Sequence, residues 1–172
     1  MASMNFGENF NLANNSFKRK FRWLLEIPDV CGDKINTLPP SKSARPSISF
    51  KEIEAQHLSE TIYFPGKPEW KPLNLTVFDV KTPDFSHPII KWISKLYEID
   101  NFTFNYKKSC DGFKVNFVNL FMFDGCGNTC ETWTFESVWV QSADFGELDM
   151  SSSDVTYCDL TLRYDRAYWI QS

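Results

Sequence analysis

The feature that most constrains the fold of this chain is a series of short stretches in which apolar and polar residues alternate. In the last of them, 155–164, every second position from 158 onward is apolar or aromatic: Cys158, Leu160, Leu162 and Tyr164. A period of two is typical of β-strands that bury one face. Comparable stretches bring the expected total to six to eight strands: 17–27, 47–54, 61–64, 73–80, 113–123 and 129–140.

Turn residues and changes of parity predict finer details of these strands. Pro28 ends the first strand, and Pro65-Gly66 ends the strand over 61–64. The apolar residues of 47–54 shift from even-numbered positions (Ile48, Phe50) to an odd-numbered one (Ile53), which indicates a β-bulge. Residues 55–60 read as a polar hairpin tip. Residues 35–38 read as a short return strand, and 141–153 as an acidic, serine-rich connection.

Two later strands have aromatic faces and are joined by a glycine-containing turn over 124–128. The first face is expected to hold Phe113, Val115, Phe117, Phe121 and Phe123. The second is expected to hold Trp133, Phe135 and Trp139. Aromatic residues fit half-buried sheet surfaces, and they are also enriched at protein interfaces, so a phenylalanine-rich core and an assembly surface both remain open.

One segment, 83–97, has helical periodicity. Ser86 can cap this helix, and Pro88 fits its first turn. Its apolar residues form a single stripe at helical spacing: Ile89, Trp92, Ile93 and Leu96. We therefore expect a helix that packs on a sheet and carries no cofactor.

The order of the predicted elements indicates the fold class. Strands cluster before and after the helix and do not alternate with further helices, which favours an antiparallel β sandwich or barrel with one packed helix. The 172 residues are 42% hydrophobic and suit a single domain, 17–172. The polar, asparagine-rich residues 1–16 are expected to form a flexible arm.

Charge and composition argue against several classes of protein. The net charge is −4, and the densest basic run, Lys18-Arg19-Lys20 followed by Arg22, reads as an exposed strand face, so no basic stripe for nucleic acid is expected. No apolar stretch reaches the ~18 residues that cross a bilayer, and 1–16 does not look like a secretory signal. Five scattered cysteines indicate no disulfide framework.

No catalytic, cofactor or metal site is expected. His57 and His87 read as surface residues. Cys126 and Cys130 flank a turn but lack the second ligand pair of a zinc site. The acidic residues of 147–154 do not have the spacing of a calcium-binding loop. These observations favour a non-enzymatic protein.

Four stretches carry a resemblance to a known family. They are 21–27 with a return ending at 37–39, then 64–77, then the Lys91-Trp92 pair, and finally the series 132–135, 146–149, 151–154 and 159–165. In order and spacing they resemble the tail tube proteins of contractile phages of the T4 type. The asparagine-rich start and the cysteines depart from that pattern, which leaves open a tube-initiating or minor baseplate component.

The resemblance implies a structural subunit that forms stacked hexameric rings, whose lumen conducts DNA during ejection. Implied partners are further copies, the tail sheath protein and the baseplate hub or tube initiator. Tape-measure protein and DNA would occupy the lumen without specific binding, and no membrane is implied. The implied location is the virion tail, assembled in the cytoplasm of a host bacterium.

The resemblance also suggests where rings meet. The hairpin over 47–64 corresponds to the family's extended element that reaches an adjacent ring, which makes Glu52, Glu54, Gln56 and His57 candidate ring-stacking residues. Ordinary exposed hairpin residues are the alternative. Other readings are the tube protein of a type VI or extracellular injection system, a carbohydrate-binding β sandwich with an aromatic platform, and, last, a metal-dependent enzyme.

Overall fold

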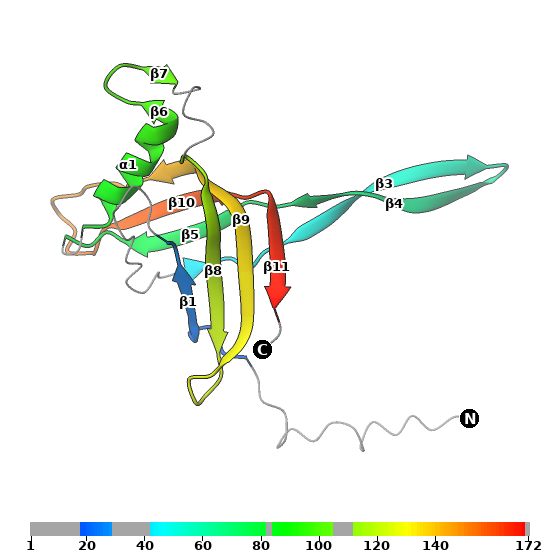
Figure 1. The fold of residues 1–172 in the computed structure, drawn as a ribbon, viewed down its shortest axis with the longest axis horizontal. Coiled ribbons are helices and arrows are strands. Elements are labelled where there is room, and N and C mark those ends of the chain that lie inside the picture. The colour runs from blue at the N-terminus through cyan, green and yellow to red at the C-terminus, as the bar shows by residue number, and fades with distance from the viewer. Residues whose placement is uncertain (1–17, 29–41, 82–83, 105–111, 171–172) are drawn as a thin grey trace.

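The computed structural model describes residues 18–28, 42–81, 84–104 and 112–170 (Figure 1). Within these ranges the chain forms one helix and eleven strands, and every strand pair is antiparallel. The strands are β1 Trp23–Glu26, β2 Lys42–Ser43, β3 Ile48–His57, β4 Glu60–Trp70, β5 Leu73–Phe78, β6 Tyr97–Glu98, β7 Thr103–Phe104, β8 Val115–Phe123, β9 Thr129–Asp144, β10 Tyr157–Arg163 and β11 Arg166–Ile170. The helix, α1, spans Ser86–Leu96, and no helix in the described ranges is long and apolar enough to cross a membrane.

Seven strands form one continuous sheet in the order β1-β8-β9-β10-β5-β2, with β11 paired to β9. The first part of β9 pairs with β8 and β11, whereas its last residues pair with β10. The sheet therefore folds over along β9 into two layers, whose strands cross in the view of Figure 1. The predicted mainly β fold with one packed helix is confirmed.

The core lies between these two layers and the helix. Alternate residues of β5 and β10 supply one side, as the period-two pattern predicted: Leu73, Leu75, Val77, Cys158, Leu160 and Leu162. Leu25, Val118 and Phe135 supply the other side and are fully buried. Burial of such side chains contributes about 1.5–3 kcal/mol each, so the sandwich interior is the main source of stability.

Helix α1 closes one end of the core through Ile89 and Trp92, which are 0% and 1% exposed. The indole Nε1 of Trp92 also donates a hydrogen bond to the main-chain carbonyl of Phe113, at 2.6 Å. The predicted capping role of Ser86 is wrong. Asp84 Oδ1 accepts from the main-chain nitrogens of Ser86 and His87, so the carboxylate two residues upstream supplies the cap.

The buried face of β8 differs from the predicted one. Val118, Leu120 and Met122 point into the core, and Phe117 is 50% exposed. Val115 is buried as predicted, so the core-facing positions change from odd-numbered to even-numbered between Val115 and Val118. The partner strand explains this change, because Ser137 has a left-handed φ of 57° opposite this point and local irregularities of this kind re-aim side chains.

The same bend affects β9. Phe135 is fully buried, but after the bend at Ser137 it is Val138 and Val140 that face the core, not Trp139 as predicted. The strand also continues to Asp144, into the segment expected to be a connection. A separate last strand, β11, was not predicted. It follows β10 after a turn at Tyr164-Asp165 and pairs with the first part of β9.

The paired strands β3 and β4 form a long hairpin, which we call the arm. The predicted bulge is confirmed, since the register shifts between Phe50 and Glu52. The predicted strand end at Pro65-Gly66 is wrong, because β4 continues through both residues to Trp70. Proline is tolerated here because the arm has only two strands and Pro65 lies beside the bulge. The tip is also shorter than the predicted 55–60, since Leu58 and Ser59 alone separate the strands.

The first predicted strand is correct only in its second part. Residues Lys18 to Arg22 precede β1 and are not in a strand, and Phe21 is 75% exposed. The proposed arm over 1–16 and the short return over 35–38 lie outside the described residues, as do Cys31 and Cys110.

Candidate assembly surfaces

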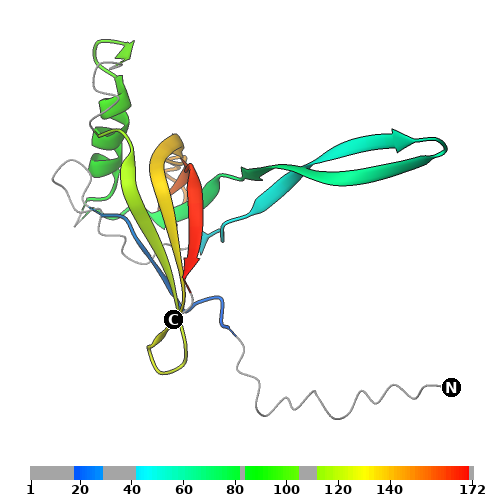
Figure 2. The same cartoon turned by 45° about the vertical axis from the view of Figure 1, so that its right-hand side comes forward.

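The arm projects away from the body of the molecule in both Figure 1 and Figure 2. Several of its large apolar side chains are open to solvent: Phe50, Ile53, Ile62, Tyr63 and Phe64 are 47–60% exposed. An isolated two-stranded ribbon gains little stability in water. Exposed apolar surface on such a ribbon indicates a contact that is completed by another molecule.

Beyond the bulge, the arm has one apolar and one polar face. Ile53 pairs with Phe64, and Ala55 with Ile62, so these four residues share a face. The alternate positions Glu52, Glu54 and Gln56 share the opposite face with Tyr63 and Thr61. A two-faced ribbon can contact one partner through apolar packing and another through charge.

Three of the four predicted ring-stacking residues therefore lie together. Glu52, Glu54 and Gln56 are exposed on the polar face of the arm. His57 is the last residue of β3, and its backbone pairs with Glu60 next to the tip. Their contact with an adjacent ring stays a prediction.

The sheet also has an open edge in the body. Among the described strands, β11 pairs with β9 alone. Trp169 and Ile170 on β11 are 55% and 53% exposed. An open edge presents unpaired N–H and C=O groups, which favour pairing with another chain. The fold thus offers an edge for lateral association at β11.

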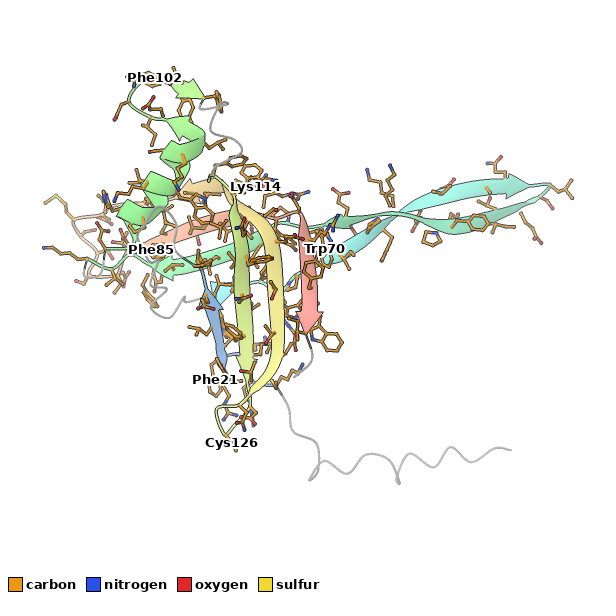
Figure 3. All side chains as sticks on the ribbon, viewed as in Figure 1. Phe21, Trp70, Phe85, Phe102, Lys114 and Cys126 are labelled. Carbon is orange, nitrogen blue, oxygen red and sulfur yellow. The ribbon has the colours of Figure 1, made fainter. Side chains whose placement is uncertain are left out.

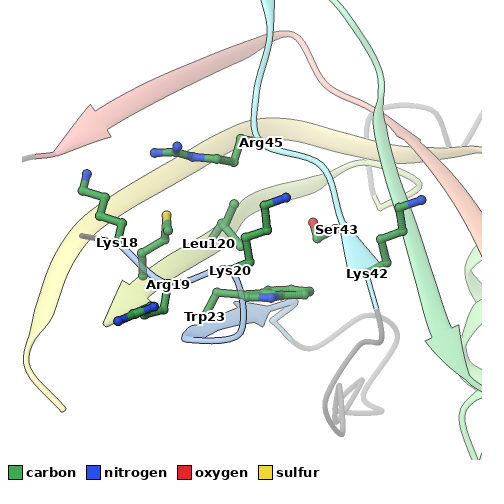
Figure 4. A pocket seen from close by; sticks show the side chains of 9 residues that line it. Lys18, Arg19, Lys20, Trp23, Lys42, Ser43, Arg45 and Leu120 are labelled. Atoms are coloured by element: carbon green, nitrogen blue, oxygen red, sulfur yellow. The ribbon is translucent and has the colours of Figure 1, made fainter. Parts of the chain in front are cut away.

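A basic cleft lies between the segment before β1 and the strands β2 and β8 (Figure 4). Its volume is about 660 Å³. Five of its lining residues are cationic, namely Lys18, Arg19, Lys20, Lys42 and Arg45, and the remainder are Trp23, Ser43, Leu120 and Met122. Sequence patterns did not predict this cleft, because its cations come from two segments more than twenty residues apart and local sequence does not show that the two segments meet.

Beside the cleft, Glu131 is the one buried charged residue in the described part of the chain, at 1% exposure. Its carboxylate pairs with the ammonium of Lys18 and the guanidinium of Arg45, and it accepts a hydrogen bond from Trp133 Nε1. Burial by itself would raise the pKa of Glu131, but the hydrogen bonds from Lys18, Arg45 and Trp133 outweigh it and lower the pKa to about 2. Glu131 therefore holds both basic segments against β9 as an ionised group.

The candidate ligand residues are not gathered into a site. No group of three or more metal-ligating side chains occurs within the described ranges. Cys126 is exposed at the tip of the β8–β9 turn (Figure 3). The turn is held by Asp124, whose Oδ1 accepts from the main-chain nitrogens of Cys126 and Asn128. These hydrogen bonds account for the conformation of the turn without a metal.

Solved structures share this architecture. A chain of the PVC extracellular contractile injection system, from its sheath–tube complex in the extended state, matches with a TM-score of 0.69 at 16% identity, covering 94% of this chain and 96% of that one. A chain from the cap that terminates the tube of the anti-feeding prophage matches with 0.69 at 14% identity, covering 92% and 93%. The chain has the fold of these tube proteins.

The tube-protein fold also extends to a type six secretion system protein, with a TM-score of 0.53 at 13% identity over 87% of this chain and 82% of that one. No protein-family model matches the sequence. No curated protein matches it either. At such identities the likeness establishes the tube-protein fold, and the resemblance predicted from sequence is thereby confirmed at the level of architecture.

Proposed function

We propose that this chain is a structural subunit of the inner tube of a contractile tail or injection apparatus. The observation that carries the proposal is the arm, whose exposed apolar face has no partner within the described body. Such a surface on a tube-protein fold is explained if another copy covers it. The open edge of β11 supports a lateral contact of the same kind.

The proposed assembly is a hexameric ring that stacks into a hollow tube. A ring closes when the same heterologous contact repeats, which requires two different, complementary surfaces on each copy. The edge of β11 and the projecting arm are two different surfaces of this kind. In such a tube the sheath would contact the outer wall and the baseplate hub would contact the first ring. The role is structural and requires no catalytic site.

Two kinds of tube remain candidates. The first is a phage tail, in which the lumen conducts DNA and the particle assembles in the cytoplasm of an infected bacterium. The second is an extracellular injection system, favoured by the fact that chains from the PVC and anti-feeding prophage particles share this fold over nearly their full length. Within either machine, a tube-terminating or baseplate component is the alternative role for this chain. Capsid and terminase genes beside the coding gene would indicate the phage.

Negative-stain electron microscopy of the purified protein at high concentration tests the proposal. We expect hollow rods or six-fold rings. A variant with Ile53→Thr and Phe64→Thr keeps β-forming side chains but removes apolar area from the arm, so it should remain folded and lose rods. A protein that stays monomeric at every concentration and binds glycans would contradict the tube and support a carbohydrate-binding module.

A further inference from the structure

The basic cleft has more positive charge than the described residues neutralise. Glu131 pairs with Lys18 and Arg45, and no described carboxylate forms an ion pair with Arg19, Lys20 or Lys42. Trp23, Leu120 and Met122 add an apolar floor to this cationic rim. The cleft thus suits a ligand that carries both carboxylates and an apolar side chain.

The loop between β9 and β10, residues 145–156, has that complementary chemistry. It contains Glu147, Asp149 and Asp154 and no basic residue. Leu148 and Met150 are 90% and 106% exposed, so the loop presents bare apolar side chains between its carboxylates. Ser151 donates to Asp149 through both its main-chain nitrogen and its hydroxyl, at 2.9 and 2.8 Å. These bonds fix the acidic turn and lower the pKa of Asp149.

The loop and the cleft occupy different regions of the same molecule. In Figure 1 the loop lies at the left-hand end of the body, whereas β1, beside the cleft, lies at its lower centre. Because the loop is anchored by β9 and β10 on either side, it does not occupy the cleft of its own chain. Two complementary, non-identical patches on one chain are what a closed ring requires.

We infer that the loop over 145–156 of one copy binds in the basic cleft of a neighbouring copy. Leu148 and Met150 pack on the floor formed by Trp23 and Met122, while the flanking carboxylates pair with the rim cations. The inference rests on the proposed function, since it names the residues of one contact within the tube. It also gives the basic run at 18–20 a role other than nucleic-acid binding.

The arm is a weaker candidate for the same cleft. Its polar face carries Glu52 and Glu54, but Lys51 and Lys67 lie beside them near the bulge. The loop contains no basic residue, and Met150 within it is the most exposed large apolar side chain of the described chain. Charge complementarity therefore favours the loop, and reversing the charges of the arm tests it as the rival occupant.

Charge reversal tests the inference. The cleft variant carries Arg19→Glu and Lys42→Glu, the loop variant carries Glu147→Lys and Asp154→Lys, and an arm variant, which tests the rival occupant, carries Glu52→Lys and Glu54→Lys. All six positions are exposed, so each variant should unfold at the wild-type temperature. We expect the cleft and loop variants each to raise the concentration needed for rod formation at least ~10-fold, because like charges then face each other.

An equimolar mixture of the cleft and loop variants should recover rods, since alternating copies restore opposite charges at every contact. In a mixture with the arm variant, the cleft variant should not be incorporated into rods. Rods formed normally by the cleft variant, or its incorporation into rods together with the arm variant, would overturn the inference while leaving the tube intact. Unchanged rods with a loss of binding to a single-stranded DNA oligonucleotide would instead assign the cleft to nucleic acid. Failure of the wild-type protein to assemble would refute the tube itself.

Discussion

Glu131 and Arg45 form an ion pair across 86 residues of sequence. Arg45 stands three residues before β3, the first strand of the arm. Since Glu131 is on β9, the pair links the base of the projecting arm to the central strand of the body. The second partner, Lys18, links the segment that precedes β1 in the same way.

Replacement of Glu131 by Gln should lower the free energy of unfolding at pH 7 by about 2–3 kcal/mol. The amide can still accept from Trp133 but no longer neutralises Lys18 and Arg45, which are about half exposed and regain some hydration. Urea unfolding followed by fluorescence measures the difference. Glu54→Gln, on the exposed arm, is the control and should change stability by less than ~0.5 kcal/mol.

The same carboxylate makes stability depend on pH. Its pKa is about 2 in the folded chain, below the ordinary 4.5, so the folded state binds its proton less readily than the unfolded chain does. The stabilisation is fully present above pH 4.5 and is lost as the pH falls towards 2. Urea titrations between pH 7 and 2.5 should therefore show the wild type and Glu131→Gln converging in acid. If the free energies of unfolding of the two proteins differed by the same amount at every pH in that range, the assignment of Glu131 as an ionised group in the folded chain would be contradicted.

Trp92→Phe should lower the free energy of unfolding by about 1–3 kcal/mol. Phenylalanine keeps much of the apolar volume but removes the Nε1 donor, which leaves the carbonyl of Phe113 without that bond. Trp169→Phe is the matched control, because Trp169 is 55% exposed on an edge strand and should tolerate the change. Thermal unfolding of both variants measures the effect, and equal melting temperatures would contradict it.

Gly146→Ala should destabilise the chain more than Gly127→Ala does. Both glycines have positive φ, 75° and 89°, so both substitutions incur backbone strain of about 1 kcal/mol. A methyl group at 146 would in addition lie 2.8 Å from the carbonyl oxygen of Tyr157, whereas nothing lies within 4 Å at 127. Chemical denaturation measures the free energy of unfolding of the two variants. Because both share the backbone strain, the difference between them gives the cost of the steric contact at 146.

Cys158 should resist alkylation in the folded protein. Its side chain is 0% exposed, and burial, with smaller contributions from Asp79, Asp159 and Asp144, raises the pKa of its thiol to about 11. Thiolate is the reactive form, so both access and ionisation are suppressed. Labelling with N-ethylmaleimide, mapped by mass spectrometry, should modify Cys126 in native buffer and Cys158 only in denaturant.

Local alternation was sufficient to predict much of the sandwich. The buried series in β5 and β10 and the stripe of Ile89 and Trp92 follow directly from periods of two and 3.6, because those elements are regular along their length. The inward faces of β8 and β9 were predicted correctly on one side of Ser137 and not beyond it, since Ser137 adopts a left-handed conformation in mid-strand that no residue type there signals. One irregular residue reverses every assignment that depends on counting through it.

The candidate surfaces were predicted less completely. A bulged hairpin carrying Glu52 and Glu54 was expected, but its continuation through Pro65 was not, because proline usually ends a strand. In a two-stranded ribbon, proline lies on an edge strand, where its missing N–H interrupts no pairing with a further strand. The cleft depends on Lys18 and Arg45 meeting around Glu131, a contact between distant segments. Contacts between distant segments depend on the topology of the fold, so local sequence patterns do not predict them.

The sixteen residues of β9 belong to both layers of the sandwich, so neither layer can slide over the other without breaking the ladder of a shared strand. Under mechanical load the body should consequently deform as a single block, with shear resisted by covalent backbone as well as by packing. We expect bending to occur instead in the arm, which is joined to that block only at its base. A wall built from such subunits would be stiff within each copy and adjustable at the joints between copies.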